Sequence, residues 1–276
     1  MYLNQDWAGD TERRAKTHVP QEIVFAEKWR IGLDLLDRAR ATLPGAWVTG
    51  DDEFGRCTEL RAALRQRRLR YVLDVPCNTL VRDVAERLPP TRPGGKPRRP
   101  AFERVDRWAA RQPGGRWRQV RVRDGAKGPQ VVKVLLATVQ TKDEEGRVGG
   151  SERLAILRSC AAKPQTWYAL SNDRVARRGD VARVHGTRHR IEEVLKEGKG
   201  EVGLADYEVR SWVGWHHHMT LSLLALWFLQ TERLRLGGKN PGHHGAASAA
   251  DLHRPAPGAK RRRRAHRRGG QPGAAA

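Results

Sequence analysis

The spacing of apolar residues predicts alternating helices and strands in the first third of the chain. Residues 20–43 carry apolar side chains at helical intervals and predict an amphipathic helix, which Leu43-Pro44-Gly45 should end. The apolar run 46–49 predicts a buried strand, residues 54–67 a second helix, and residues 70–76 a second strand. This order of helix, strand, helix and strand is typical of a parallel α/β sheet.

The regular alternation stops after residue 81. Residues 88–100 form a loop rich in Pro, Gly and Arg, and residues 117–122 and 130–138 alternate as two strands around the turn Asp124-Gly125. We therefore predict a β-rich insertion, after which residues 167–171 return to the main sheet as a strand.

Two helices follow this strand. The first is predicted over residues 180–197, with Asp180 as its N-cap and Gly198 and Gly200 ending it. The second, over residues 207–235, is apolar on most sides and is expected to be buried. Its longest apolar run has 11 residues, too few to cross a bilayer, so no membrane partner is expected.

Composition indicates an intracellular protein with a polyanionic partner. The 276 residues include 53 Lys and Arg against 31 Asp and Glu, a formal net charge of +22, which favours nucleic acid. Three scattered cysteines form no CxxC pair and argue against a structural zinc site and against a disulfide framework. The N-terminus also lacks a signal-peptide pattern, so we expect a cytoplasmic, nucleoid-associated protein.

The C-terminal residues 237–276 consist mainly of Gly, Ala, Pro and Arg. With almost no large apolar side chain, this tail is predicted to be disordered. Its KRRRRAHRR run would bind phosphates without sequence preference, or would be a solvated tail with no role of its own.

Polar residues at helical spacing mark one face of the helix predicted over 180–197 and just beyond it. They are separated by three, four, four and three residues: His185, Arg188, Glu192, Lys196 and Lys199. A carboxylate between cations suits a metal-bound phosphodiester, because the carboxylate shares the ion while the cations neutralise phosphate oxygens. Spacing alone favours the other interpretation, an exposed helix held by salt bridges.

Five blocks of sequence resemble bacterial insertion-sequence DDE transposases. Arg188, Glu192 and Lys199 match the last three letters of the YREK signature of that family, with His185 where the family has Tyr. The block that follows, GEVGLADYEVRSWVGWHHHMTLSLLALWFL, is similar to the family in order and spacing. The remaining similar blocks, in family order, are WVTGDDEFGR, RYVLDVPCNTLV and WYALSND.

The resemblance implies an RNase H-like core and DNA cleavage with strand transfer at insertion-sequence ends, supported by two Mg²⁺ ions. Asp51 and Glu192 would be catalytic metal ligands, and the phosphate-binding residues would be Arg188, Lys199, His185 and Lys196. Double-stranded transposon-end DNA would be the substrate, bound by a homodimer in a synaptic complex. The chain would divide into an N-terminal remnant (1–19), two parts of the core (20–81 and 163–236), the β-rich insertion (82–162) and the basic tail (237–276).

One departure from the family concerns the first catalytic Asp. The family carries it on a strand before the region that MYLNQDW resembles, and Asp6 and Asp10 lie in a polar segment without a strand pattern. We therefore expect a core that is incomplete at its N-terminus, an exposed edge on the Trp47 strand, and weak or absent cleavage by this chain alone.

Two alternatives stay open at this stage. The chain could be a transposase remnant that binds transposon ends without cutting them, or a basic RNA-binding or structural protein whose motif match is coincidental. Preference for a terminal inverted repeat would distinguish them, because phosphate contacts alone do not discriminate sequence.

Overall fold

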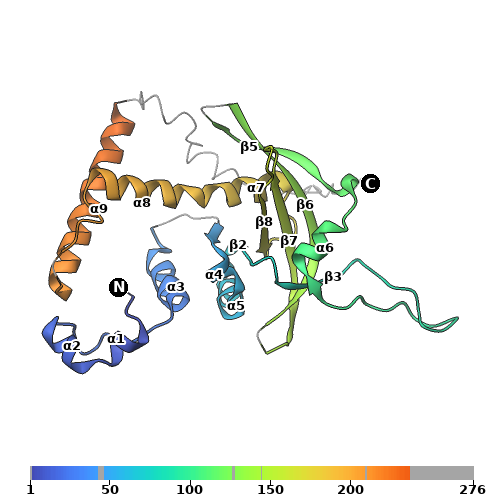
Figure 1. Cartoon of the computed structure of the whole chain (residues 1–276), viewed down its shortest axis with the longest axis horizontal. Coiled ribbons are helices and arrows are strands. Elements are labelled where there is room, and N and C mark those ends of the chain that lie inside the picture. The colour runs from blue at the N-terminus through green and yellow to red at the C-terminus, as the bar shows by residue number, and fades with distance from the viewer. Residues whose placement is uncertain (1, 43–46, 126–127, 144, 209, 237–276) are drawn as a thin grey trace, which may run out of the picture. The chain divides into compact units, whose positions relative to one another are not determined.

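The protein is built around one mixed β-sheet flanked by helices (Figure 1). The structure is a computed structural model that describes residues 2–42, 47–125, 128–143, 145–208 and 210–236. Eight strands lie in this part of the chain, seven of them in the order β1-β2-β8-β7-β6-β3-β4, with β5 pairing to β6. The α/β class predicted from the sequence is confirmed. The predicted tail lies outside the described residues.

The two strands predicted first are confirmed and are parallel. β1 (Trp47–Gly50) pairs with β2 (Arg70–Asp74) in a register that places Gly50 beside Leu73. Within the described part of the sheet, β1 is the terminal strand. One of its edges is therefore unpaired there, which agrees with the exposed edge predicted for this strand. Because parallel strands end at the same edge of a sheet, the residues that follow each strand emerge together.

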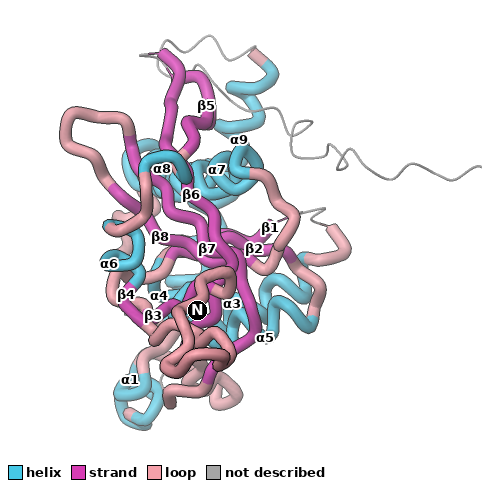
Figure 2. Tube along the Cα trace, turned by 90° about the vertical axis from the view of Figure 1, so that its right-hand side faces the viewer, coloured by secondary structure: helices cyan, strands magenta, loops and turns pink. Residues whose placement is uncertain are grey.

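The strands of the predicted insertion continue the same sheet. β6 (Gly128–Lys142) and β7 (Val148–Ser159) are long antiparallel strands, and β8 (Thr166–Ser171) joins β7 to β2. On its other edge β6 pairs in turn with β5 (Arg118–Gly125) and β3 (Leu80–Asp83), as Figure 2 shows from the side. The short β4 (Glu103–Arg104) completes the order.

Helices bury apolar residues against both faces of the sheet. On one face, Trp108 of α6 (Val105–Ala110) packs with Leu154 and Ile156 of β7. On the other, Val181 and Ala182 of the helix after β8 pack with Ala155 and Leu157. The alternation along β7 is that of a strand buried on both faces.

The helix predicted over residues 20–43 is shorter than expected. α3 covers Lys28–Ala39, whereas Ile23 closes a turn onto Pro20 and Val24 is exposed. The Arg14 guanidinium donates to the carbonyl oxygens of Pro20 and Gln21, which competes with helix formation there. The predicted stop at Leu43-Pro44-Gly45 lies outside the described residues.

The helix predicted over residues 54–67 is in fact two helices. α4 (Asp52–Arg56) ends at Cys57, whose backbone is extended and whose thiol accepts a hydrogen bond from the Leu60 amide. Cys57 thereby caps α5 (Thr58–Gln66), which packs on β2 with α3. The sequence periodicity did not reveal this break, because both helices present apolar residues to the same cluster.

The helix predicted over residues 180–197 is also divided. α7 (Arg178–Thr187) and α8 (His189–Glu201) meet at Arg188, which keeps right-handed helical dihedrals, so the two helices follow one line in Figure 1. Asp180 is not the N-cap as predicted. It is the third residue of α7 and accepts a hydrogen bond from the Arg177 backbone amide at 3.2 Å. Gly198 and Gly200 lie inside α8, because Gly198 packs tightly on Leu204 and Leu226.

The last helix is largely exposed, which contradicts the prediction that it is buried. In α9 (Trp212–Arg235) only Ser222 and Leu226 are buried, while Leu221, Trp227 and Phe228 are more than half exposed. It packs along α8, where Gln230 and Arg233 both bind Glu197. The apolar composition of a helix does not show whether other elements of the chain pack against it, so composition alone could not predict its exposure.

Two short helices precede α3, namely α1 (Gln5–Gly9) and α2 (Thr11–Lys16), and a 3₁₀ turn at Gly114–Arg116 leads into β5. None of the described helices has both the length and the apolar character needed to cross a bilayer.

Candidate DNA-processing site

The ends of β1 and β2 place two aspartates at the same edge of the sheet. Gly50 pairs with Leu73, so Asp51 and Asp74 are the next residues on adjacent parallel strands. The sequence reasoning selected Asp51 and missed Asp74. The signal was nevertheless present, because Asp51 closely follows the first predicted strand and Asp74 lies near the end of the second.

Asp51 is exposed and acts as the N-cap of α4. Its carboxylate accepts hydrogen bonds from the backbone amides of Glu53 at 3.1 Å and Phe54 at 3.4 Å. The turn is held against β2 by Gly55, where an added β-carbon would lie 1.7 Å from the carbonyl oxygen of Asp74. Only glycine permits this approach of α4 to β2.

Asp74 is buried and binds two residues of the predicted polar helix face. Its Oδ1 lies 3.0 Å from His185 Nε2, and its Oδ2 lies 3.3 Å from Arg188 Nε. His185 also packs against the ring of Trp167, with centroids 5.8 Å apart. Asp74 therefore lies beside both His185 and Arg188 at the edge where the strands end.

Glu192 is tied to the same group through Arg188. Arg188 Nη1 lies 3.3 Å from Glu192 Oε1, and His189 Nδ1 lies 2.9 Å from Glu192 Oε2. The guanidinium of Arg188 thus connects Asp74 on β2 with Glu192 on α8. Lys196 and Lys199 are exposed on the following turns of the same helix. The structure brings His185, Arg188 and Glu192 together around Asp74, and no contact joins Asp51 to Glu192 in the described part of the chain.

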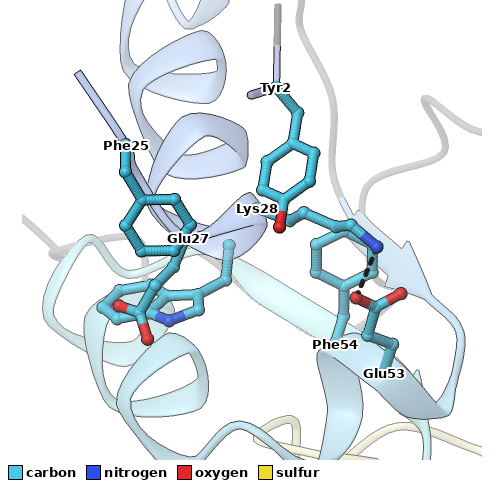
Figure 3. A pocket seen from close by; sticks show the side chains of 7 residues that line it. Tyr2, Phe25, Glu27, Lys28, Glu53 and Phe54 are labelled. Atoms are coloured by element: carbon cyan, nitrogen blue, oxygen red, sulfur yellow. Dashed lines mark hydrogen bonds and ion pairs between the residues drawn. The ribbon is translucent and has the colours of Figure 1, made fainter. Parts of the chain in front are cut away.

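An aromatic pocket lies beside the Asp51 turn (Figure 3). It has a volume of about 270 Å³, and Glu53 and Phe54 of α4 line it together with Tyr2, Phe25, Glu27, Lys28 and Trp29. Lys28 Nζ lies 2.8 Å from Glu53 Oε1, and this contact raises the pKa of Lys28. The N-terminal segment therefore packs against the helix that Asp51 caps.

The N-terminal part of the chain matches a known family. Residues 1–129 match the family model described as DDE superfamily endonuclease. This match supports a DDE transposase-type protein. The mixed α/β fold is consistent with the RNase H-like DDE fold, and the matched endonuclease domain supports a nuclease or transposase type of function and implies a DNA substrate. No curated protein matches the chain.

The match includes Asp51 and Asp74 but ends before Arg188, so the residues that resemble the YREK signature lie beyond it. DDE superfamily enzymes usually use divalent metal ions. The described residues do not present a group of three or more candidate metal ligands. As placed, Asp51 binds its own helix, while Asp74 and Glu192 bind an arginine. The donor set therefore does not fit a two-metal centre, and we derive no metal-dependent step.

Proposed function

We propose that this chain binds the ends of an insertion sequence as a transposase of the YREK branch, with Arg188 at the centre of its phosphate-binding face. The observation that carries this proposal is the position of the Arg188 guanidinium, 3.3 Å from both Asp74 and Glu192. Its planar fork suits a phosphate, and its two carboxylate partners hold it at the edge where β1 and β2 end.

Asp74 acts in this proposal as a positioning residue. A buried carboxylate that contacts both His185 and Arg188 fixes where their nitrogen atoms lie before DNA arrives. Such preorganisation lowers the entropy lost when a phosphate is bound. Lys196 and Lys199 extend the same face along α8, where they would contact the next phosphates of the backbone.

Catalysis by the chain alone should be weak. The resemblance predicts Asp51 and Glu192 as catalytic Mg²⁺ ligands, but Asp51 caps its own helix and Glu192 pairs with Arg188, so they do not form the group of carboxylates that shares the ions in a two-metal mechanism. The lack of such a group among the described residues favours a second candidate function, a DNA-end-binding protein that does not cut. Both candidate functions require recognition of transposon ends. A transposase would bind those ends as a homodimer in a synaptic complex.

Binding to a duplex that carries the terminal inverted repeat tests the proposal against a generic basic protein. We expect at least a tenfold tighter affinity than for a scrambled duplex of the same length, because base contacts discriminate where phosphate contacts do not. Equal affinities would overturn the proposal.

The role of Arg188 is tested by Arg188→Gln, with Arg183→Gln as a control of equal charge change on α7. Loss of one phosphate contact should weaken binding to all duplexes and reduce the slope of log K against log salt by about one. Arg183 is exposed and paired with Asp180, so its loss should leave the slope unchanged.

A nicking assay on transposon-end DNA with Mg²⁺ separates the two candidates. We expect little or no cleavage by the purified chain. Robust cleavage that is abolished by Glu192→Gln and retained by the neighbouring Glu193→Gln would show that the chain is a competent nuclease. That result would overturn the proposal that its catalysis is impaired.

A further inference from the structure

The loop between β3 and α6 forms a projecting basic arm, defined here as residues 88–99. A backbone bridge closes its base, with Leu88 and Arg98 exchanging hydrogen bonds of 2.9 and 3.0 Å. A turn forms its tip, where the Gly95 amide donates to the Arg92 carbonyl and Gly94 has a φ of 73°. Figure 1 shows its two legs running side by side away from the sheet.

The arm is exposed and does not contribute to the core, so packing does not explain its presence. Residues 89–99 are all exposed, and burial resumes only at Pro100. Its prolines at 89, 90, 93 and 97 fix the backbone in an extended form without a core beneath it. A segment that is rigid and extended before binding loses little entropy when it is placed on a partner.

Four cations of the arm have no carboxylate partner among the described residues: Arg92, Lys96, Arg98 and Arg99. No Asp or Glu occurs between Glu86 and Glu103. Those two glutamates flank the arm, and both bind Arg111, with Glu86 Oε2 at 2.8 Å from Arg111 Nη2. The acids nearest to the arm are therefore already neutralised, and the arm keeps its full positive charge.

This arrangement differs from that of the arginines on the neighbouring strands and turns. Arg104 pairs with Asp106, Arg121 with Asp124 and Arg123 with Glu193. Uncompensated charge on an extended, exposed segment attracts a polyanion. The arm carries no aromatic side chain to stack on single-stranded bases and no Asn or Gln to read adenine.

We propose that this arm binds the sugar–phosphate backbone of duplex DNA as a second, sequence-independent contact. The inference rests on the proposed function in that DNA is the substrate. The arm follows β3, which is separated from β2 by β8, β7 and β6, so the strand that leads into the arm lies about 19 Å along the sheet from the strand that ends in Asp74. The arm therefore holds a different stretch of duplex from the one at Arg188.

Salt-dependent binding of the full chain to a scrambled 30-bp duplex (about three helical turns) tests the arm. The variant changes all four arm cations to Gln. Because each phosphate contact contributes about 0.9 to the slope of log K against log salt, we expect the slope to fall by about three to four and the affinity at 0.1 M salt to fall at least tenfold.

A control variant removes the same charge elsewhere, at exposed arginines paired with carboxylates within their own helix or turn: Arg13, Arg30, Arg38 and Arg235. Their change to Gln should alter the slope by less than one, and both variants should keep the wild-type melting temperature. Equal slopes for the arm and control variants would overturn the inference. A larger loss on duplex RNA than on duplex DNA would also overturn it, because the arm would then serve another nucleic acid.

The outcome for the arm is separate from that for the proposed function. If the arm variant loses slope while the wild-type chain shows no preference for a terminal inverted repeat, the arm stands and the transposase proposal fails. If the preference is present and the arm variant behaves like its control, the arm inference fails alone.

Discussion

The carbonyl oxygen of Asp74 lies against Gly55 so closely that a β-carbon at residue 55 would be 1.7 Å away. This contact joins the helix capped by Asp51 to the strand that carries Asp74. The position of Asp51 therefore depends on Gly55, four positions later in the sequence, having no side chain.

Gly55→Ala should therefore destabilise the protein. The new methyl group would push α4 from β2, and overpacking of this kind costs about 1–3 kcal/mol. Urea unfolding measures the loss. Gly32→Ala is the control, because Gly32 lies inside α3 with no heavy atom within 4 Å of its added β-carbon, and that change should stabilise the helix by up to about 1 kcal/mol. A neutral Gly55→Ala would contradict the close packing.

Glu152 should be the most sensitive carboxylate of the sheet. It is 2% exposed and binds Arg61, which is also buried, together with Arg65 and the Tyr71 hydroxyl. Glu152→Ala would leave the Arg61 guanidinium buried without its carboxylate, which costs about 3–5 kcal/mol. The exposed Glu145, paired with Arg147, is the control, and its change to Ala should cost less than about 1 kcal/mol. Equal losses in urea unfolding would show that the buried network is not the cause.

Tyr71 should make the protein less stable in alkaline solution. Burial and the neighbouring Glu152 raise the pKa of Tyr71 above its ordinary value of 10.0. Above about pH 10 the unfolded chain releases this proton while the folded chain retains it, so the free energy of unfolding falls as pH rises.

Tyr71→Phe should reduce this loss per pH unit when urea unfolding is measured from about pH 8 to pH 11. Tyr2→Phe, at an exposed side chain, should keep the wild-type slope. A Tyr71→Phe protein with the full alkaline loss would exclude Tyr71 as its source.

The exposure of α9 predicts a contrast between neighbouring leucines. Leu226 is buried and packs on Gly198 of α8, so Leu226→Ala should destabilise the α8–α9 pair by about 2–3 kcal/mol. Leu224 is 54% exposed, so Leu224→Ala should change stability by less than about 0.5 kcal/mol. Hydrogen exchange of the α9 amides reports the difference, and similar protection in both variants would mean that α9 is covered on more than one side.

The sequence by itself determined the α/β class, the strands β1, β2 and β8, and the polar spacing from His185 to Lys199. These features depend on alternation, helical period and turn residues, which act over a few neighbouring positions. The family resemblance, rather than these local signals, predicted an exposed edge on the Trp47 strand.

Only the tertiary structure decided the remaining features. Asp74 became part of the site because β2 lies beside β1 and because α7 and the residue after it bring His185 and Arg188 to its carboxylate from more than 100 positions away. The breaks at Cys57 and Arg188 and the exposure of α9 likewise depend on which surfaces meet. Local periodicity can show that a face is apolar or charged, but the partner of that face is chosen by contacts between distant segments, and those contacts are set by packing of the whole chain.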